Sequence, residues 1–268
     1  MAVLSIDTSA AVAVALISDD GRRLAARTVD ERRRHAEQLA PMIEEVLAEA
    51  GLSRADLTAV VVGTGPAPFT GLRVGLVTAR TLALALGVPV LGVPSVDVLA
   101  IQAVADLGLT PDDEILVTTD ARRREVYWAR YRVVAHEGPG GVPVVETLAG
   151  PAVGRAAEVA AEQVSGGEIN GGQVSAEQAV SGPDAAGRVA PVAGARLAVV
   201  GEGAALYPDA LDAAEDAPTL LDPVVLARVG LQRRAAGQDL PTEPLYLRRP
   251  DVHVPVRTPA ASIPGSTS

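Results

Sequence analysis

The sequence predicts an α/β protein of two lobes, each built on its own sheet. Two observations support this prediction. Short β-branched segments alternate with segments of helical periodicity, and a unit of strand, Asp, turn and strand occurs twice. The first strand of one copy ends at Asp7 and that of the other ends at Asp120. Chance is the alternative, since apolar strands often end in Asp, but α/β segments follow each copy and favour an internal duplication.

The first lobe is expected over residues 1–108. It begins with two strands within 3–17, joined by the turn at Asp7, and a third strand at 23–29. Two amphipathic or apolar helices and two buried strands without alternation follow, at 36–50, 72–86, 58–62 and 88–93.

The second lobe is expected over residues 109–250. Its predicted elements are strands at 114–119, 126–131 and 196–200, a weak helix at 153–164 and a helix at 224–236. Residues 165–194 are rich in Gly, Ser, Ala and Gln, which predicts a flexible insertion. Residues 251–268 are expected to be a disordered tail.

Composition excludes several classes of chemistry. The chain of 268 residues has no cysteine, and all 23 of its basic residues are arginine. Thiolate, Schiff-base and P-loop lysine chemistry are therefore excluded. A net charge of −10 argues against a protein that binds nucleic acid by itself, because binding to phosphates requires a positively charged surface. The N-terminus has no basic region before its apolar residues, so we expect a cytoplasmic protein with no membrane association.

The stretch Gly65-Pro66-Ala67-Pro68-Phe69-Thr70-Gly71-Leu72-Arg73 joins a strand to a helix. It holds the single phenylalanine of the chain within a Gly/Pro turn, which predicts a fixed loop. Thr70 is expected to cap the helix, with Gly71 giving the turn its freedom. Without a lysine or a second Gly-rich turn nearby, the loop is interpreted as a rigid lead-in to the helix and not as a phosphate cradle.

The helix at 72–86 has little polar surface and must be covered on nearly all sides. Gly75, Ala79 and Ala83 fall at i, i+4 and i+8 and form a groove of small side chains. One interpretation buries this helix between the sheet and the first helix. The other, which is modestly favoured, places one side of it against another protein chain.

No convincing catalytic or metal site emerges. His35 and Glu37 lie about 200° apart on a helix, so they could share a metal ion only in extended backbone, and a role at the start of the first helix is preferred. Asp7 and Asp120 could hold Mg²⁺ in a two-lobed phosphotransferase, but capping of their turns is favoured. The arginine runs at 32–34 and 122–124 are interpreted as solvated, or as contacts for an acidic partner or RNA phosphates in a larger assembly.

Five segments together resemble the bacterial TsaB (YeaZ) family of tRNA threonylcarbamoyladenosine biosynthesis proteins. They are the opening residues 4–9 with Asp7, the pair His35 and Glu37, the loop 65–73, the segment 120–127 after Asp120, and residues 244–248. The match is close over 1–132 and loose over 196–250. Within the loop, Gly65, Pro66, Phe69, Thr70, Gly71 and Arg73 follow the family pattern. Ala67 and Pro68 depart from it, stiffening the loop and removing a polar contact.

This resemblance implies an actin/Hsp70-like ATPase fold with two RNase-H-like lobes. It also implies a non-catalytic subunit that pairs with the catalytic paralogue TsaD and works with the ATPase TsaE. Together they place a threonylcarbamoyl group on N6 of adenosine 37 in tRNAs reading codons that begin with A. The chain would then bind no cofactor or metal of its own, the complex would use ATP, and tRNA would be met through the complex.

The resemblance also places the pairing surface on the first two helices. The expected contact residues are Leu39, Ile43, Val46, Arg73, Leu76, Ala79 and Ala83, and the free chain could use the same surface to form a homodimer. One alternative is a free-standing phosphotransferase or weak ATPase that uses Asp7 and Asp120. A secreted peptidase is a second, which the missing metal spacing and signal peptide disfavour.

Overall fold

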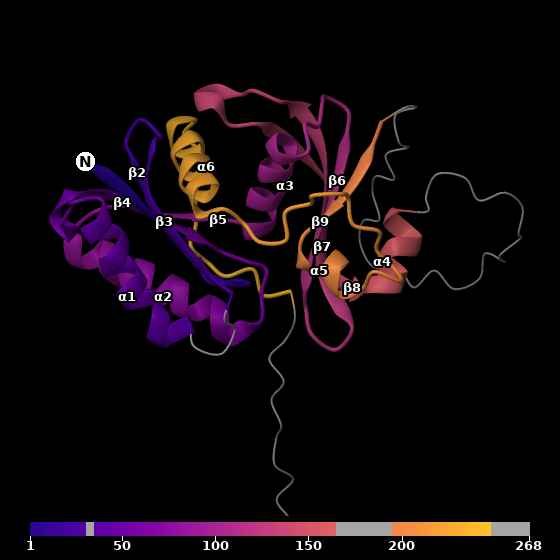
Figure 1. The fold of residues 1–268 in the computed structure, drawn as a ribbon, viewed down its shortest axis with the longest axis horizontal. Helices are drawn as coiled ribbons and strands as arrows, with labels where there is room; N and C mark the ends of the chain where they lie inside the picture. The colour runs from indigo at the N-terminus through magenta and orange to yellow at the C-terminus, as the bar shows by residue number, and fades with distance from the viewer. Residues whose placement is uncertain (31–34, 165–194, 248–268) are drawn as a thin grey trace, which may run out of the picture.

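The computed structural model describes residues 1–30, 35–164 and 195–247 of the chain. Five layers follow one another, in the order helices, sheet, helices, sheet, helices (Figure 1). This arrangement confirms the predicted two-lobed α/β fold. The expected insertion at 165–194 and the tail at 251–268 lie outside the described residues.

The first sheet has the strand order β3-β2-β1-β4-β5. Its strands are β1 (Ala2–Asp7), β2 (Val12–Ser18), β3 (Arg23–Val29), β4 (Leu57–Gly63) and β5 (Val90–Val93). The central strand β1 pairs antiparallel with β2 and parallel with β4. All five strands were predicted, and their bounds agree with the prediction to within two residues.

The second sheet has the order β8-β7-β6-β9. Its strands are β6 (Glu114–Asp120), β7 (Glu125–Ala135), β8 (Val144–Arg155) and β9 (Leu197–Val200). Strand β6 pairs antiparallel with β7 and parallel with β9, as β1 does with β2 and β4. The repeated pairing confirms the predicted duplication. Strand β8 was not predicted, and it takes residues 153–155 from the expected helix.

Helices cover both faces of each sheet because neighbouring side chains of a strand point to opposite faces. In β1, Leu4 and Ile6 face α1 and α2, whereas Val3 faces the middle layer of α3 and α6. The helices are α1 (His35–Glu49), α2 (Phe69–Leu86), α3 (Ser95–Asp106), α4 (Ala156–Gln163), α5 (Glu202–Leu206) and α6 (Pro223–Ala235). Short 3₁₀ turns lie at η1 (Arg54–Asp56) and η2 (Pro139–Gly141).

The structure corrects the predicted lobe boundaries. Helix α6 was expected in the second lobe, but it packs on the first sheet, where Pro223 O accepts a hydrogen bond of 2.6 Å from Ser5 Oγ. Gly230 allows this packing, since a Cβ there would lie 2.6 Å from Val61. Helix α3 was missed because it is apolar on nearly every side, with eight of its twelve residues buried.

Candidate functional site: the interlobe junction and the outer face of helix α2

Each sheet carries a buried Asp at the end of its central strand. Oδ1 of Asp7 accepts a hydrogen bond of 2.8 Å from the backbone N–H of Ser9, two residues on. Oδ1 of Asp120 accepts the equivalent bond, also of 2.8 Å, from Arg122. Both carboxylates therefore close their own turns, which confirms the preferred interpretation of the two residues.

The second oxygen of Asp7 is also engaged. Ser95 Oγ, at the first residue of α3, donates to Asp7 Oδ2 at 2.6 Å and accepts from the N–H of Gly65 at 3.2 Å. The N–H of Ser95 donates to Gly65 O at 2.7 Å. Gly63 leaves room for the carboxylate, because a Cβ there would lie 1.8 Å from Oδ2. Asp7 thus anchors the loop that begins at Gly65.

The space between the two strand ends is almost filled. Asp7, Pro66, Ser95, Thr119 and Leu221 are among the residues around a cavity of about 10 Å³. That volume suits about one water molecule, whereas small-molecule sites measure hundreds of Å³. The turn Asp7-Thr8-Ser9 also lacks the glycines that bring backbone amides to a phosphate. A nucleotide therefore does not fit this cavity beside Asp7.

The loop between β4 and α2 is fixed, as predicted, but the helix starts earlier than expected. Gly65 has a φ of 88°, and a Cβ there would lie 2.9 Å from Ala67 N. Helix α2 begins at Phe69 with Pro68 at its N-cap position and no side-chain cap. The predicted cap by Thr70 is wrong, because Thr70 is already inside the helix and exposed.

The structure also corrects the predicted contact residues. Six of the seven apolar or basic side chains expected to meet a partner lie in the chain's own core, each with 5% or less of its surface exposed: Leu39, Ile43, Val46, Leu76, Ala79 and Ala83. The small side chains of α2 likewise lie against the first sheet and not against a helix of another protein. A Cβ at Gly75 would lie 2.6 Å from Thr8 Oγ1.

The opposite face of α2 is open. Val77 and Leu84 are 60% and 84% exposed and lie seven residues apart, which places them on one side of the helix. Helix α2 is long and apolar enough to cross a membrane, with 18 residues and a mean hydropathy of 1.3. Its buried face packs on a sheet, however, and its arginines are bound within the chain.

Residues 240–246, called here the C-terminal strap, run beside this open face (Figure 1). The strap is joined to the first lobe by backbone bonds from Gly92 N–H to Leu240 O and from Leu245 N–H to Thr64 O. Arg80 Nε donates to Thr242 Oγ1 at 2.8 Å and to the strap backbone through a second nitrogen.

Arg73 differs from its expected role. Its Nε donates to the hydroxyl of Tyr246 in the strap at 2.8 Å, and its guanidinium lies 3.5 Å from the centre of the Phe69 ring. The rings of Phe69 and Tyr246 are 4.9 Å apart. We expected Arg73 to contact a partner, but its guanidinium is engaged by the chain's own aromatic side chains, so the single phenylalanine serves to join the loop, the helix and the strap.

The outer face of α1 is acidic. Glu44, Glu45 and Glu49 are exposed there, as is Glu37 in the first turn, where the helix dipole favours a carboxylate. His35 is the first residue of α1. Among the described residues no group of three or more His, Cys, Asp or Glu side chains is arranged to hold a metal ion.

The arginine run 122–124 is exposed, as predicted, but Arg122 is not merely solvated. Arg122 donates to Asp120 Oδ2 at 2.8 Å. All three arginines have left-handed backbone, with φ of 64°, 56° and 64°. The other run, 32–34, lies outside the described residues.

Sequence reasoning missed Ser95 and the partners of Arg73. Ser95 is the first residue of α3, after Pro94 at the N-cap position, and no side chain caps this helix. Its contact with Asp7 spans 88 residues and leaves no local pattern. Tyr246 was named only within residues 244–248, as part of the family resemblance.

Three comparisons with known proteins agree with this fold. The family model described as TsaD, tRNA N6-adenosine threonylcarbamoyltransferase, matches residues 29–249. An uncharacterised protein of Mycobacterium tuberculosis is 46% identical over 159 residues, which are 59% of this chain and 66% of that protein. The Escherichia coli tRNA threonylcarbamoyladenosine biosynthesis protein TsaB is 35% identical over 137 residues, 49% of this chain and 55% of that protein.

The solved structure of YeaZ from Pseudomonas aeruginosa superposes with a TM-score of 0.65 at 25% identity, covering 92% of this chain and 99% of that one. The matched segments span 40% to 66% of the length of the curated relatives. The family model covers most of the chain, and the named relatives and the solved structure agree with it. Within the actin/Hsp70-like ATPase superfamily, the chain resembles the TsaB/YeaZ proteins. The family model shows that the chain belongs to the TsaD family.

Proposed function

We propose that this chain is a non-catalytic, cytoplasmic subunit required for N6-threonylcarbamoyladenosine in tRNA. In this role it pairs with TsaD, works with TsaE and meets tRNA through their complex. Relatives named for the biosynthesis of threonylcarbamoyladenosine support this function. The cavity beside Asp7 is only about 10 Å³ and admits no nucleotide, which supports the absence of chemistry at these strand ends.

The outer face of α2 is the observation that carries the scaffolding role. Val77 and Leu84 expose large apolar side chains on a helix whose other side is already buried in the core. Exposed apolar surface of this kind is characteristic of contacts with another protein. The acidic outer face of the neighbouring α1 would supply a polar rim to such an interface.

The function is tested by deleting the gene and analysing nucleosides in tRNA hydrolysates. We expect threonylcarbamoyladenosine to disappear and to return when the full chain is supplied again. Modification at its normal level in the deletion strain would refute the proposal. Turnover of ATP by the isolated chain, lost on Asp7→Asn, would favour the free-standing ATPase instead.

The interface is tested by co-purification of the full chain with TsaD. Leu84→Glu should weaken the association at least about tenfold, because a charge replaces an apolar contact at the interface. Val134 is 49% exposed on β7, far from α2 in the sequence, and Val134→Glu is the matched control. Equal recovery of TsaD with both variants would place the interface elsewhere. Sedimentation of the free chain with and without Leu84→Glu shows whether a homodimer uses the same face.

A further inference from the structure

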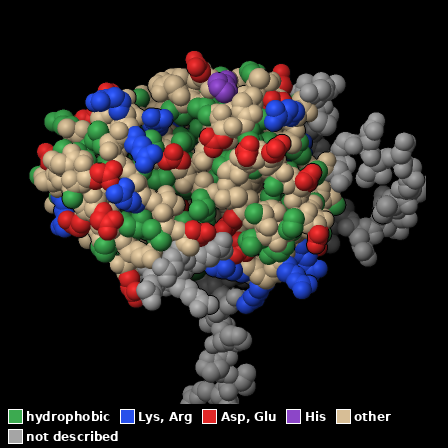
Figure 2. Space-filling view, in the orientation of Figure 1, with side chains coloured by type: hydrophobic (Ala, Val, Ile, Leu, Met, Phe, Trp, Pro, Cys, Tyr) green, Lys and Arg blue, Asp and Glu red, His purple; other side chains and the backbone are tan. Residues whose placement is uncertain are grey.

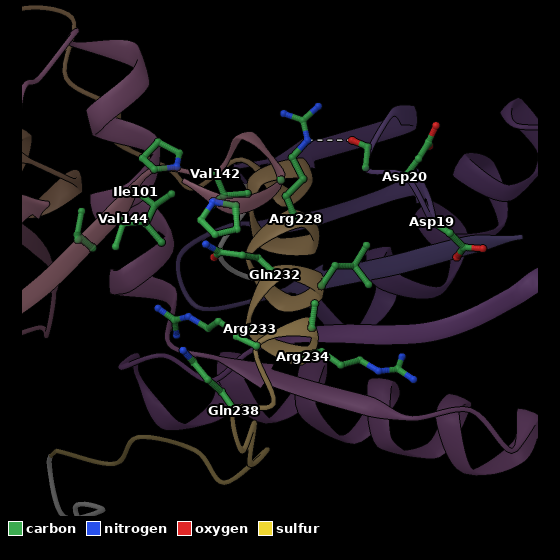
Figure 3. Close-up of a pocket in the computed structure, with 18 residues that line it drawn as sticks. Asp19, Asp20, Ile101, Val142, Val144, Arg228, Gln232, Arg233, Arg234 and Gln238 are labelled. Carbon is green, nitrogen blue, oxygen red and sulfur yellow. Dashed lines mark hydrogen bonds between the residues drawn. The ribbon is translucent and has the colours of Figure 1, made fainter. Parts of the chain in front are cut away.

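A groove of about 860 Å³ lies between the lobes, away from the strand ends that carry Asp7 and Asp120. Helix α6 forms one wall, and α3, η2 and the start of β8 form the other (Figure 3). The β2–β3 turn at Asp19 and Asp20, at the opposite end of β2 from the Asp7 turn, closes one end. The volume falls within the range of small-molecule sites, which often occur between domains.

Three hydrogen-bond donors lie on the same side of this groove. Figure 3 shows Gln232, Arg233 and Gln238 directed from α6 and its C-terminal end toward the wall that carries Ile101 and Val144. Within the described part of the chain, the side-chain amides of Gln232 and Gln238 make no hydrogen bond. A guanidinium has five N–H donors, and Arg233 uses one nitrogen for Asp97 Oδ2, at 2.8 Å.

The position of Arg233 is fixed from behind. Asp97 on α3 accepts this bond from Arg233 and a bond of 2.7 Å from the hydroxyl of Tyr131 on β7. The side chains of Arg233 and Asp97 are 20% and 18% exposed, so the pair is largely removed from solvent. Arg233 is therefore oriented before any ligand arrives, which lowers the entropic cost of binding.

The rest of the groove is lined by apolar side chains, by Asp19 and Asp20, and by Arg228 and Arg234. Its wall opposite the donors is formed by Ile101, Val142 and Val144. Asp19 and Asp20 lie at the other end and have partners already: Thr58 Oγ1 donates to Asp19 at 2.8 Å, and Arg22 Nε donates to Asp20 at 3.1 Å. One end of the groove thus offers unused donors beside an apolar wall.

We propose that this groove binds a small organic carboxylate, its carboxylate held by Gln232, Arg233 and Gln238 and its apolar body against Ile101, Val142 and Val144. A carboxylate is the matching anion because it accepts bonds from a guanidinium and from amides in one plane. The proposal concerns a part of the molecule remote from the α2 face and does not depend on the proposed function.

The test uses 4-phenylbutyrate as the probe and 4-phenylbutan-1-ol as its neutral counterpart, with the full chain labelled with ¹⁵N. We expect the carboxylate to shift the side-chain amide signals of Gln232 and Gln238 saturably. The alcohol should bind about tenfold more weakly, because charge-assisted hydrogen bonds are lost. Equal binding of the two probes, or no saturable shift up to about 10 mM, would overturn the proposal.

Three variants test the location of the site. Val144→Trp should fill the groove and abolish binding, whereas Val134→Trp, on an exposed part of β7, should leave the affinity unchanged. Gln238→Ala should weaken the carboxylate about threefold to tenfold without affecting the alcohol. Gln238 is exposed three residues beyond the end of α6, so this variant keeps the fold and the Arg233–Asp97 pair. Unchanged affinity in Val144→Trp would show that the probe binds elsewhere.

Discussion

At the scale of single residues, Asp113 shows how a buried carboxylate organises two loops. It is 7% exposed and accepts hydrogen bonds from the backbone N–H of Thr110 at 2.9 Å, from Thr110 Oγ1 at 3.0 Å and from the N–H of Arg196 at 2.9 Å. Burial by itself raises the pKa of the carboxyl, but the hydrogen bonds from Thr110 and Arg196 outweigh it. The net pKa is below the usual 3.8.

A lowered pKa in the folded state makes Asp113 stabilising above the unfolded pKa of about 3.9. This contribution decreases as the pH falls through the folded pKa. We predict that Asp113→Asn lowers the free energy of unfolding at pH 7 by about 1–3 kcal/mol and that the difference shrinks below about pH 4. Urea denaturation at several pH values measures both effects.

Asp112 is the matched control, since it is adjacent in sequence and exposed. It has a left-handed φ of 73°, which asparagine tolerates well, so Asp112→Asn should change stability by less than about 0.5 kcal/mol. A penalty for Asp113→Asn that is constant from pH 3 to pH 7 would contradict the assigned role of its charge.

The residue types at the interlobe junction predicted the local turn bonds of Asp7 and Asp120 but not the long-range bonds. Asp7 and Asp120 each bond to a backbone N–H two residues away, and such local bonds follow from the preference of Asp for turns. The bonds from Ser95 to Asp7 and from Arg73 to Tyr246 join residues 88 and 173 positions apart. No periodicity or spacing reports contacts of this kind, because they arise from tertiary packing.

At the scale of elements, one hydroxyl adds two hydrogen bonds to the apolar packing of α2 on the first sheet. Thr8 Oγ1 donates to Gly71 O at 2.9 Å and accepts from the N–H of Gly75 at 3.0 Å. These two backbone groups are four residues apart, the pair that an α-helix bonds directly. The absence of a side chain at Gly75 lets Thr8 approach, which explains why this position is glycine.

We predict that Thr8→Val destabilises the protein by about 1–3 kcal/mol, because it removes a buried hydroxyl that bridges two backbone groups. Thr8→Ser keeps the hydroxyl and should cost clearly less. Thermal and chemical denaturation of the two variants provide the comparison. If Thr8→Val leaves the stability unchanged while Thr8→Ser lowers it, the methyl group of Thr8 and not its hydroxyl holds the helix.

The composition of α2 predicted a helix that is largely buried, but it did not predict which face of the helix is buried. Apolar residues surround the helix, so the sequence pattern has no distinct polar face from which to infer its orientation. The small residues were assigned to a partner, but they face Thr8 and the sheet. The open side is shown instead by the exposure of Val77 and Leu84, which only the packed structure reveals.

At the scale of the whole molecule, the chain crosses between lobes more often than its sequence suggests. The duplicated strands predicted two sheets, because each sheet is built from strands close together in sequence. Helix α6 returns from the second lobe to the first sheet, and the C-terminal strap continues along α2. The space-filling view in Figure 2 shows that atoms of the chain cover the junction between the lobes on this face. The return of α6 follows from burial of its apolar side, which no local pattern assigns to one sheet or the other.

The bonds of Tyr131, Asp97 and Arg233 connect β7, α3 and α6, and so join the second sheet to helices of the middle layer. Burial of the Tyr131 hydroxyl, with the nearby Asp97 carboxylate, raises its pKa well above 10. A group with a raised folded pKa contributes stability that is fully present below its unfolded pKa of about 10. This contribution is lost as the pH rises toward the folded value.

The composition makes this contribution measurable, because the chain has no lysine or cysteine and only four tyrosines. We predict that phenol absorbance shows tyrosine ionisation that is delayed until the protein unfolds in alkali, and that Tyr131→Phe reduces this delayed step by one tyrosine. Tyr131→Phe should be less stable at pH 7 by about 1–2 kcal/mol, since Asp97 loses a buried donor. Above pH 10 it should lose less stability than the unmodified protein. Ionisation of all four tyrosines before unfolding would show that the Tyr131 hydroxyl does not tie the lobes together.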